Sequence, residues 1–345
     1  MRSVLLVVPQ LVPEPADALS SAFTLNRRFA ALHRLLVRAR PQHQPSEHAS
    51  GWLCEAFGVR VADGDWPVAA LTLLAEGHEP GTDVWLRADP VHLQARQSEL
   101  VLVGSDRLGV SAAEAAALIE SLNRHFAEDG LTFLAAAPQR WCVRTAQPAR
   151  MRTTPVDQAE DHSIDALLPR GPDALAWHRR ANEVQMLLHA HPVNEAREVM
   201  GIPPINSVWF WGAGPLPRRT VEPAPSIADA TVWADDALAR GLALYAHRPL
   251  HALPDAGETW LAQAANGRHL IVFDPLAGAA QPAAWEQRAA HLDAAWLRPL
   301  LRALSRGTLR ELTLITQHAG SVLSFALSRA DLWKLWRRSH SLARA

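Results

Sequence analysis

The hydrophobic positions change their spacing several times along the chain, and these changes predict the first elements. Residues 3–8 form a nearly continuous apolar run that Pro9 ends, which is typical of a buried strand. Residues 16–39 then carry leucine and phenylalanine at helical spacing. The polar residues 41–48 indicate a loop, and residues 49–80 are expected to form short helices interrupted by glycines and a Trp-Pro pair.

Between residues 81 and 149 the pattern changes to short strands around one helix. Ser111 and Glu114 have the spacing of a capping box, in front of an alanine-rich helix that runs to Phe126. This β-β-α-β-β block predicts a small α+β lobe, residues 81–149, inserted into a larger domain. Its strands are expected at 84–87, 100–104, 131–135 and 141–144.

After residue 172 the chain again alternates between helices and strands. The alternation predicts an α/β core, a doubly wound and mostly parallel sheet built from the discontinuous segments 1–80 and 150–345. The expected elements are helices at about 173–190, 229–239 and 283–305, strands at 207–211, 269–273 and 312–316, an edge strand at 322–327 and a last helix containing DLWKLWRR (331–338).

Residues 191–214 join a helix to a strand through polar residues that a hydrophobic core would not select. His191, Asn194 and Arg197 are three residues apart, so on a helix they project on nearly the same side. Gly201 and a proline pair end the helical pattern, and a Gly-Ala-Gly sequence closes the strand, where a ligand or another backbone can come close. Polar groups at such a junction predict an anion or small-molecule site. The alternative is an ordinary helix–turn–strand whose polar residues cap the helix and contact solvent.

Composition and charge restrict the classes of partner. The chain has 34 basic and 35 acidic residues in 345, a formal charge of −1, and no basic stripe that would favour nucleic acid or an anionic membrane. Lys334 is the only lysine, which excludes a phosphate loop of the Walker type. The positive charge is therefore nearly all arginine, whose fork of donors suits phosphate and carboxylate ligands.

The two cysteines, Cys54 and Cys142, are far apart and do not indicate a disulfide scaffold or a zinc site. No apolar run approaches the ~20 residues that a membrane span needs, and the apolar start is too short for a signal peptide. We therefore expect a cytoplasmic protein. The motifs HExxH and GxSxG do not occur in the sequence, so it favours neither a zinc protease nor a serine hydrolase.

Three segments resemble a known family. Residues 191–214, HPVNEAREVMGIPPINSVWFWGAG, resemble the HPxN…R…G…N…GxG segment of archaeal-type cofactor-independent phosphoglycerate mutases, members of the alkaline-phosphatase-like superfamily. Residues 83–93, DVWLRADPVHL, resemble the substrate-domain strand of that family, which carries an arginine at the position of Arg87. Together with LNRHFAEDGLTFLAAAPQRW (122–141), ADPVHL is similar to a bacterial subgroup described as phosphoglycerate mutase or RpfE-type regulatory protein. The resemblance implies an alkaline-phosphatase-like fold.

The chain departs from this family where the chemistry is expected. The resemblance implies two divalent metals, Mn or Zn, held by aspartates and histidines, and a serine that becomes phosphorylated. Here Pro9-Gln10 replaces an Asp-Gly pair, Gln317-His318 replaces an Asp-His pair, and Trp66 takes the place of the serine. A neutral amide replaces a carboxylate poorly as a ligand of a divalent cation. The residues that remain are too few for a two-metal site: Asp274, His291, Asp293 and His318, of which Asp274 and His318 are the candidate ligands.

We therefore expect no catalytic residue and no cofactor, and a binding or regulatory protein for a small phosphorylated or carboxylated metabolite, with a protein partner left open. The alternative is an active cofactor-independent phosphoglycerate mutase, or a related phosphotransferase, that uses Mn or Zn. An unrelated structural partner protein would leave the polar 191–214 cluster without a role. The expected ligand-binding residues, in one cleft between lobe and core, are Arg87, His92, His191, Asn194, Arg197 and Asn206.

Overall fold

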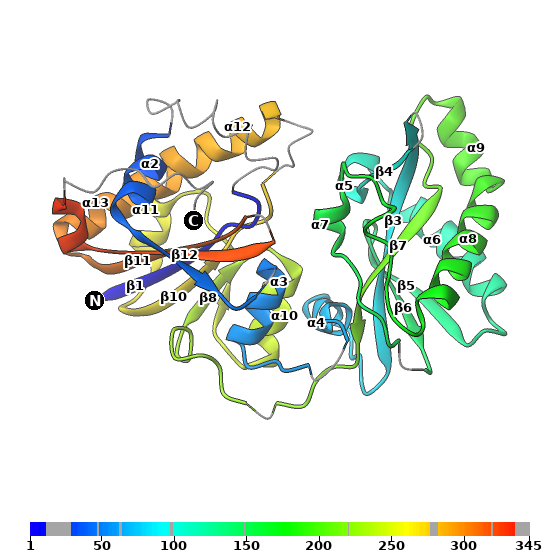
Figure 1. The fold of residues 1–345 in the computed structure, drawn as a ribbon, viewed down its shortest axis with the longest axis horizontal. Coiled ribbons are helices and arrows are strands. Elements are labelled where there is room, and N and C mark those ends of the chain that lie inside the picture. The colour runs from blue at the N-terminus through cyan, green and yellow to red at the C-terminus, as the bar shows by residue number, and fades with distance from the viewer. Residues whose placement is uncertain are drawn as a thin grey trace. The chain divides into compact units, whose positions relative to one another are not determined.

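The chain folds into two compact units (Figure 1). The first unit comprises Met1–Val59 and Arg219–Ala345, and the second unit comprises Arg60–Arg218. This division differs from the expected boundaries, since 60–80 and 150–218 belong with 81–149. The structure is a computed structural model that describes residues 1–11, 29–46, 48–61, 64–96, 99–147, 149–219, 221–276, 282–318 and 320–334.

A seven-stranded sheet forms the centre of the first unit, in the order β2-β12-β11-β1-β10-β8-β9. The neighbours from β11 to β9 run parallel, whereas β12 and β2 are antiparallel additions at one edge. The expected mostly parallel α/β sheet is therefore confirmed. Its strands are β1 (Arg2–Val7), β2 (Arg40–Gln44), β8 (Thr231–Ala234), β9 (Leu250–His251), β10 (Gly267–Val272), β11 (Leu309–His318) and β12 (Ser321–Ser328).

Helices cover both faces of this sheet (Figure 1). On one face Val4 and Leu6 of β1 pack with apolar residues of α2, α11, α12 and α13. On the other face lie α3 and α10, which contact each other and the strands β11 and β8. The bounds of these helices are α2 (Ala30–Arg38), α3 (Ala49–Ala56), α10 (Ala237–Tyr245), α11 (Gly257–Gln263), α12 (Pro282–His291) and α13 (Arg298–Arg306).

A π-helical segment, Leu292–Leu297, joins α12 to α13 in what was expected to be one helix over 283–305. It carries Asp293, whose side chain is fully buried. The Asp293 Oδ1 atom accepts the N–H of Leu32 at 2.8 Å, and Oδ2 accepts from Arg298 Nε at 3.1 Å. Because α2 has no side-chain cap of its own, Asp293 supplies an acceptor to its first turn.

Several sequence expectations in the first unit differ from the structure or lie partly outside the described residues. The polar segment expected as a loop contains β2, which pairs with β12, so 322–327 is not an edge strand. Part of the helix expected at 229–239 is the buried strand β8, and α10 begins only after Asp236, whose Oδ1 accepts from Ala239 N at 2.7 Å. Only 29–39 of the helix expected at 16–39 lies in the described residues. The last described element is a 3₁₀ helix, Arg329–Trp333, and 335–338 lie outside the described residues.

A five-stranded antiparallel sheet forms the centre of the second unit. The first strand, β3 (Val84–Arg96), is one long strand rather than a short one, and it pairs with β4, β6 and β7. The expected strand at 207–211 is therefore β7 of this sheet and not part of the parallel core. Hydrophobicity could not decide its partner, because β7 is buried along most of its length. The other strands are β4 (Glu99–Val103), β5 (Leu131–Ala137), β6 (Arg140–Thr145) and β7 (Ser207–Gly214).

Successive residues of β3 face opposite sides of this sheet. Leu86 and Ala88 pack with apolar residues of α6 and α8, whereas α4 contacts β3 and β7. The expected capping box of Ser111 and Glu114 is confirmed at the start of α6. No helix among the described residues is long and apolar enough to cross a membrane. The helices of this unit are α4 (Val68–Ala75), α5 (Ser105–Leu108), α6 (Ala112–His125), α7 (Val156–Ala159), α8 (Ala174–His189) and α9 (Pro192–Val199).

Candidate functional site

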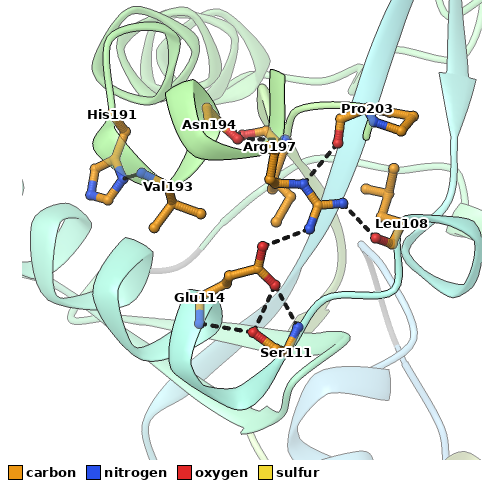
Figure 2. A network of polar contacts seen from close by, with 9 residues as sticks. Leu108, Ser111, Glu114, His191, Val193, Asn194, Arg197 and Pro203 are labelled. Carbon is orange, nitrogen blue, oxygen red and sulfur yellow. Dashed lines mark hydrogen bonds and ion pairs between the residues drawn. The ribbon is translucent and has the colours of Figure 1, made fainter. Parts of the chain in front are cut away.

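His191 caps the N-terminus of α9 (Figure 2). Its Nδ1 atom accepts the N–H of Val193 at 3.2 Å, and its Nε2 atom lies 3.0 Å from Ser121 Oγ. Since Nδ1 accepts, the proton of the neutral ring is on Nε2 and points to the serine oxygen. Burial lowers the pKa of His191, which favours this neutral form.

Asn194 connects the end of α8 to the segment that enters β7. Its Nδ2 group donates to Leu188 O and to Ile205 O, both at 2.8 Å, and its Oδ1 accepts the N–H of Ile205 at 2.8 Å. The side chain is 1% exposed. An amide is needed here because the site requires a donor and an acceptor on one planar group.

Arg197 connects α9 to three other protein groups (Figure 2). Its Nε donates to Pro203 O at 2.8 Å, Nη1 to Glu114 Oε1 at 2.8 Å, and Nη2 to Leu108 O. Glu114 also accepts from Ser111, so the arginine is joined to the start of α6. Burial acts to raise the pKa of Glu114, but the hydrogen bonds from Ser111 and Arg197 hold it below its usual value.

His92 and Asn206 bind β3 to the extended segment before β7. Asn206 accepts the N–H of Leu93 at 2.7 Å and donates to Leu93 O at 3.0 Å. His92 Nδ1 lies 2.9 Å from Pro204 O, to which it donates, and burial lowers the pKa of the half-buried ring. Both side chains therefore make local contacts that fix how the chain enters the sheet.

Arg87 projects from β3 next to Asp89, on the face opposite Leu86. Its Nε donates to Asp89 Oδ1 at 3.1 Å, its Nη2 donates to the same oxygen, and its guanidinium lies 5.3 Å from the Trp211 ring centroid. Trp211 Nε1 donates to Asp89 Oδ2 at 2.7 Å. Burial raises the pKa of Asp89 even though Arg87 acts to lower it. The i, i+2 spacing of Arg87 and Asp89 in a strand was the sequence signal for this pair.

The structure thus brings only part of the expected set together. His191, Asn194 and Arg197 belong to neighbouring contacts around α9, and Asn206 and His92 secure the next segment, whereas Arg87 pairs with Asp89 and Trp211. All six residues lie in the second unit instead of being divided between lobe and core. Each of the six side chains contacts protein groups, and that of His191 caps α9.

The positions implied as metal ligands lie in the first unit. Gln317 Oε1 accepts the N–H of Ala49, the first residue of α3, at 3.1 Å. Asp293 has both oxygens occupied by Leu32 and Arg298. Asp274 follows β10 and is exposed, and the side chain of His318 lies outside the described residues. Within the described part of the chain, no three His, Cys, Asp or Glu residues are grouped to hold a metal ion. These donors do not fit the two-metal centre that the resemblance implies.

Sequence comparison gives partial matches to one kind of enzyme, and no family model matches the chain. The chain is 30% identical over 113 residues to the 2,3-bisphosphoglycerate-independent phosphoglycerate mutase of Methanosarcina mazei, 32% of this chain and 28% of that protein. It is 33% identical over 144 residues to phosphoglycerate mutase 2 of the same kind from Methanothermobacter thermautotrophicus, 40% of this chain and 35% of that protein. A probable mutase from Geobacter sulfurreducens is 30% identical over 137 residues, 39% of this chain and 34% of that protein.

The matched segments thus span about a third of the length of these curated relatives. In structure, the chain is similar to the PH0037 protein from Pyrococcus horikoshii, with a TM-score of 0.54, 14% identity, and 95% of this chain and 87% of that chain covered. At this identity the likeness concerns the fold alone. The chain is therefore phosphoglycerate mutase-like in the matched segments, and its mixed α/β fold is similar to that of the PH0037 protein.

Proposed function

We propose that this protein is a phosphoglycerate mutase-like protein without a metal centre, which acts as a binding or regulatory protein in the manner of the RpfE-type subgroup that its sequence resembles. The observation that carries the proposal is the contact between Gln317 and Ala49. A neutral amide stands where the resemblance implies a ligating aspartate, and its oxygen accepts from the N-terminus of α3. An amide supplies no charge to a divalent cation, so this position supports structure and not metal binding.

Two further positions support the same proposal. Asp293 is fully buried between α2 and Arg298, and moving it onto a metal would remove its hydrogen bonds to both. Trp66 stands in the place of the phosphorylated serine and has no nucleophilic atom. Losing one ligand could be compensated by a neighbour, but losing the nucleophile as well removes the phosphoenzyme route.

The ligand class follows from the names of the relatives, which are mutases of phosphoglycerate, a phosphorylated carboxylate. We place its binding in the second unit, on Arg87. The other five expected residues, His92 included, hold backbone or Glu114 contacts that a ligand would have to break. At Arg87 a phosphate would compete with Asp89 for the guanidinium, so we expect weaker binding than an unpaired arginine would give.

The test combines metal analysis, titration and an activity assay on the purified full chain. Metal content is measured by mass spectrometry, and 3-phosphoglycerate is titrated calorimetrically in EDTA and in Mn²⁺. We expect saturable binding that EDTA does not change, and no conversion of 3-phosphoglycerate in an enolase-coupled assay with Mn²⁺. Conversion that EDTA abolishes would overturn the proposal in favour of the active mutase.

Two arginines of β3 provide a matched pair of variants. Arg87→Ala should abolish the binding of 3-phosphoglycerate, whereas Arg96→Ala should leave it unchanged, because Arg96 is exposed at the end of the strand. Equal binding by both variants would remove Arg87 from the site. Absence of binding by the wild-type protein would contradict the ligand class.

A further inference from the structure

The carboxylate of Asp65 lies where three distant segments of the second unit meet. Asp65 precedes α4, Thr153 lies between β6 and α7, and Gly212 and Ala213 lie at the end of β7. The Thr153 N–H donates to Asp65 Oδ1 at 2.9 Å, and the Thr153 hydroxyl donates to Oδ2. The backbone N–H groups of Gly212 and Ala213 lie near enough to this carboxylate to act to lower its pKa. Two donors of Thr153 therefore bind the carboxylate beside two further backbone N–H groups, and we call these four groups the Thr153–Ala213 cradle.

The donors of this cradle are neutral backbone and hydroxyl groups. Successive backbone N–H groups around a residue in the left-handed conformation form a concavity that binds anions, and Gly212 has φ +66°. Burial raises the pKa of Asp65, although the hydrogen bonds from Thr153, Ala213 and Gly212 act to lower it. The cradle thus holds a half-buried carboxylate with the kind of donors that an oxyanion site uses.

Contacts that do not involve Asp65 hold the β7 part of the cradle. Trp85 pairs with Gly214, so the ladder between β3 and β7 continues past Gly212. A Cβ built on Gly212 would lie 2.9 Å from the Cβ of Val68, which shows how closely α4 packs there. The N–H groups of Gly212 and Ala213 are therefore fixed by the sheet and by α4.

The Thr153 part is held in the same way. Thr154 O accepts from Trp209 Nε1 at 2.8 Å, and the backbone of Arg152 forms an isolated antiparallel β-bridge with that of Arg170. Thr153 Oγ1 also accepts the N–H of Gly212 at 3.1 Å, which connects the two parts directly. Removing the Asp65 side chain would leave these contacts in place and the donors pointing at the same position.

We propose that the Thr153–Ala213 cradle is a binding site for small carboxylates, and that Asp65 occupies it as a built-in competitor. A free carboxylate placed there would receive the same N–H and hydroxyl donors. The tethered side chain has a high effective concentration, so it excludes free carboxylates from the wild-type protein. This inference does not depend on the ligand proposed for Arg87.

The experiment uses the full chain with Asp65→Ala, titrated with sodium formate and sodium acetate. Binding is followed by calorimetry and by the thermal midpoint, against sodium chloride at equal ionic strength. We expect saturable binding and a rise of the midpoint in Asp65→Ala, and neither in the wild-type protein. No saturable effect in the variant, or an equal effect in both proteins, would overturn the proposal.

A second substitution distinguishes acetate binding in the cradle from nonspecific effects of salt. Thr153→Val added to Asp65→Ala removes the hydroxyl donor and should weaken acetate binding about tenfold, as expected for one hydrogen bond to a charged group. Unchanged affinity would overturn the assignment to this cradle. If Asp65→Ala does not fold in chloride, its refolding yield is measured in acetate. Recovery in acetate supports the site, and no recovery in either salt overturns it.

Discussion

Arg197 and Glu114 form an ion pair of 2.8 Å between residues 83 positions apart, and the arginine side chain is 1% exposed. The pair connects α9 to the capping box of α6 and leaves the guanidinium donating to three protein groups. An arginine that the sequence suggests as an anion ligand is thus part of the packing between two helices.

Replacing Arg197 with Ala should lower the free energy of unfolding by about 3 kcal/mol, because Glu114 and two carbonyl oxygens lose their donors. Urea denaturation measures this change, with Arg179→Ala, an exposed arginine on α8, as the control that should change little. Arg197→Lys should recover only part of the loss, since an ammonium cannot reproduce the fork. An unchanged stability with a weakened anion affinity would show that Arg197 is a ligand residue after all.

Gln317 gives a prediction for the first unit. Gln317→Ala should destabilise the protein by about 1 kcal/mol, because the N–H of Ala49 loses its acceptor at the start of α3. Gln317→Glu keeps an acceptor and adds a negative charge near a helix N-terminus, so it should be neutral or slightly stabilising. Thermal unfolding with and without Mn²⁺ checks both. A midpoint that rises with Mn²⁺ in the wild-type protein would contradict the structural role.

His269 predicts a dependence of stability on pH. Trp233 Nε1 donates to His269 Nδ1 at 3.1 Å, and His269 Nε2 lies 3.0 Å from Ala265 O, so the neutral ring satisfies both contacts. Burial lowers the pKa of His269, and Arg2 and His251 act in the same direction. The unfolded state therefore binds the proton more readily, and stability is lost as the pH falls below the unfolded pKa of about 6.5.

His269→Gln should remove this contribution. The difference in unfolding free energy between the wild-type protein and the variant should be constant above about pH 7 and should shrink below it. Denaturation at a series of pH values measures the difference. If the two proteins lose stability in parallel as the pH falls, His269 does not contribute to the pH dependence.

Substitutions at two glycines with positive φ distinguish the free-energy cost of steric contact from the cost of backbone strain. A Cβ at Gly77 (φ +81°) meets no atom within 4 Å, whereas one at Gly212 (φ +66°) lies 2.9 Å from Val68 Cβ. Gly77→Ala should therefore cost about 1 kcal/mol for the left-handed conformation. Gly212→Ala should cost roughly 1–3 kcal/mol more, because α4 must also move. Equal losses in denaturation would show that α4 accommodates the added methyl group without cost.

Local signals in the sequence were sufficient to predict several features of the structure. Ser111 and Glu114 identify the start of α6, His191 precedes a helix, and Gly201 ends it with φ +70°. The alternation of apolar runs indicated the α/β class of the first unit. These features depend on residues close in sequence, whose backbone preferences and short-range hydrogen bonds act in any context.

The tertiary structure alone decided which segments pair and which charges meet. A strand as apolar as β7 fits a parallel or an antiparallel sheet, and only its pairing with β3 places 150–218 in the second unit. Likewise, spacing shows that Arg197 shares a helix face with His191, but not that Glu114 and Leu108 lie opposite it. Whether an arginine binds a ligand or a protein carboxylate depends on residues far away in sequence, and these come together only when the chain folds.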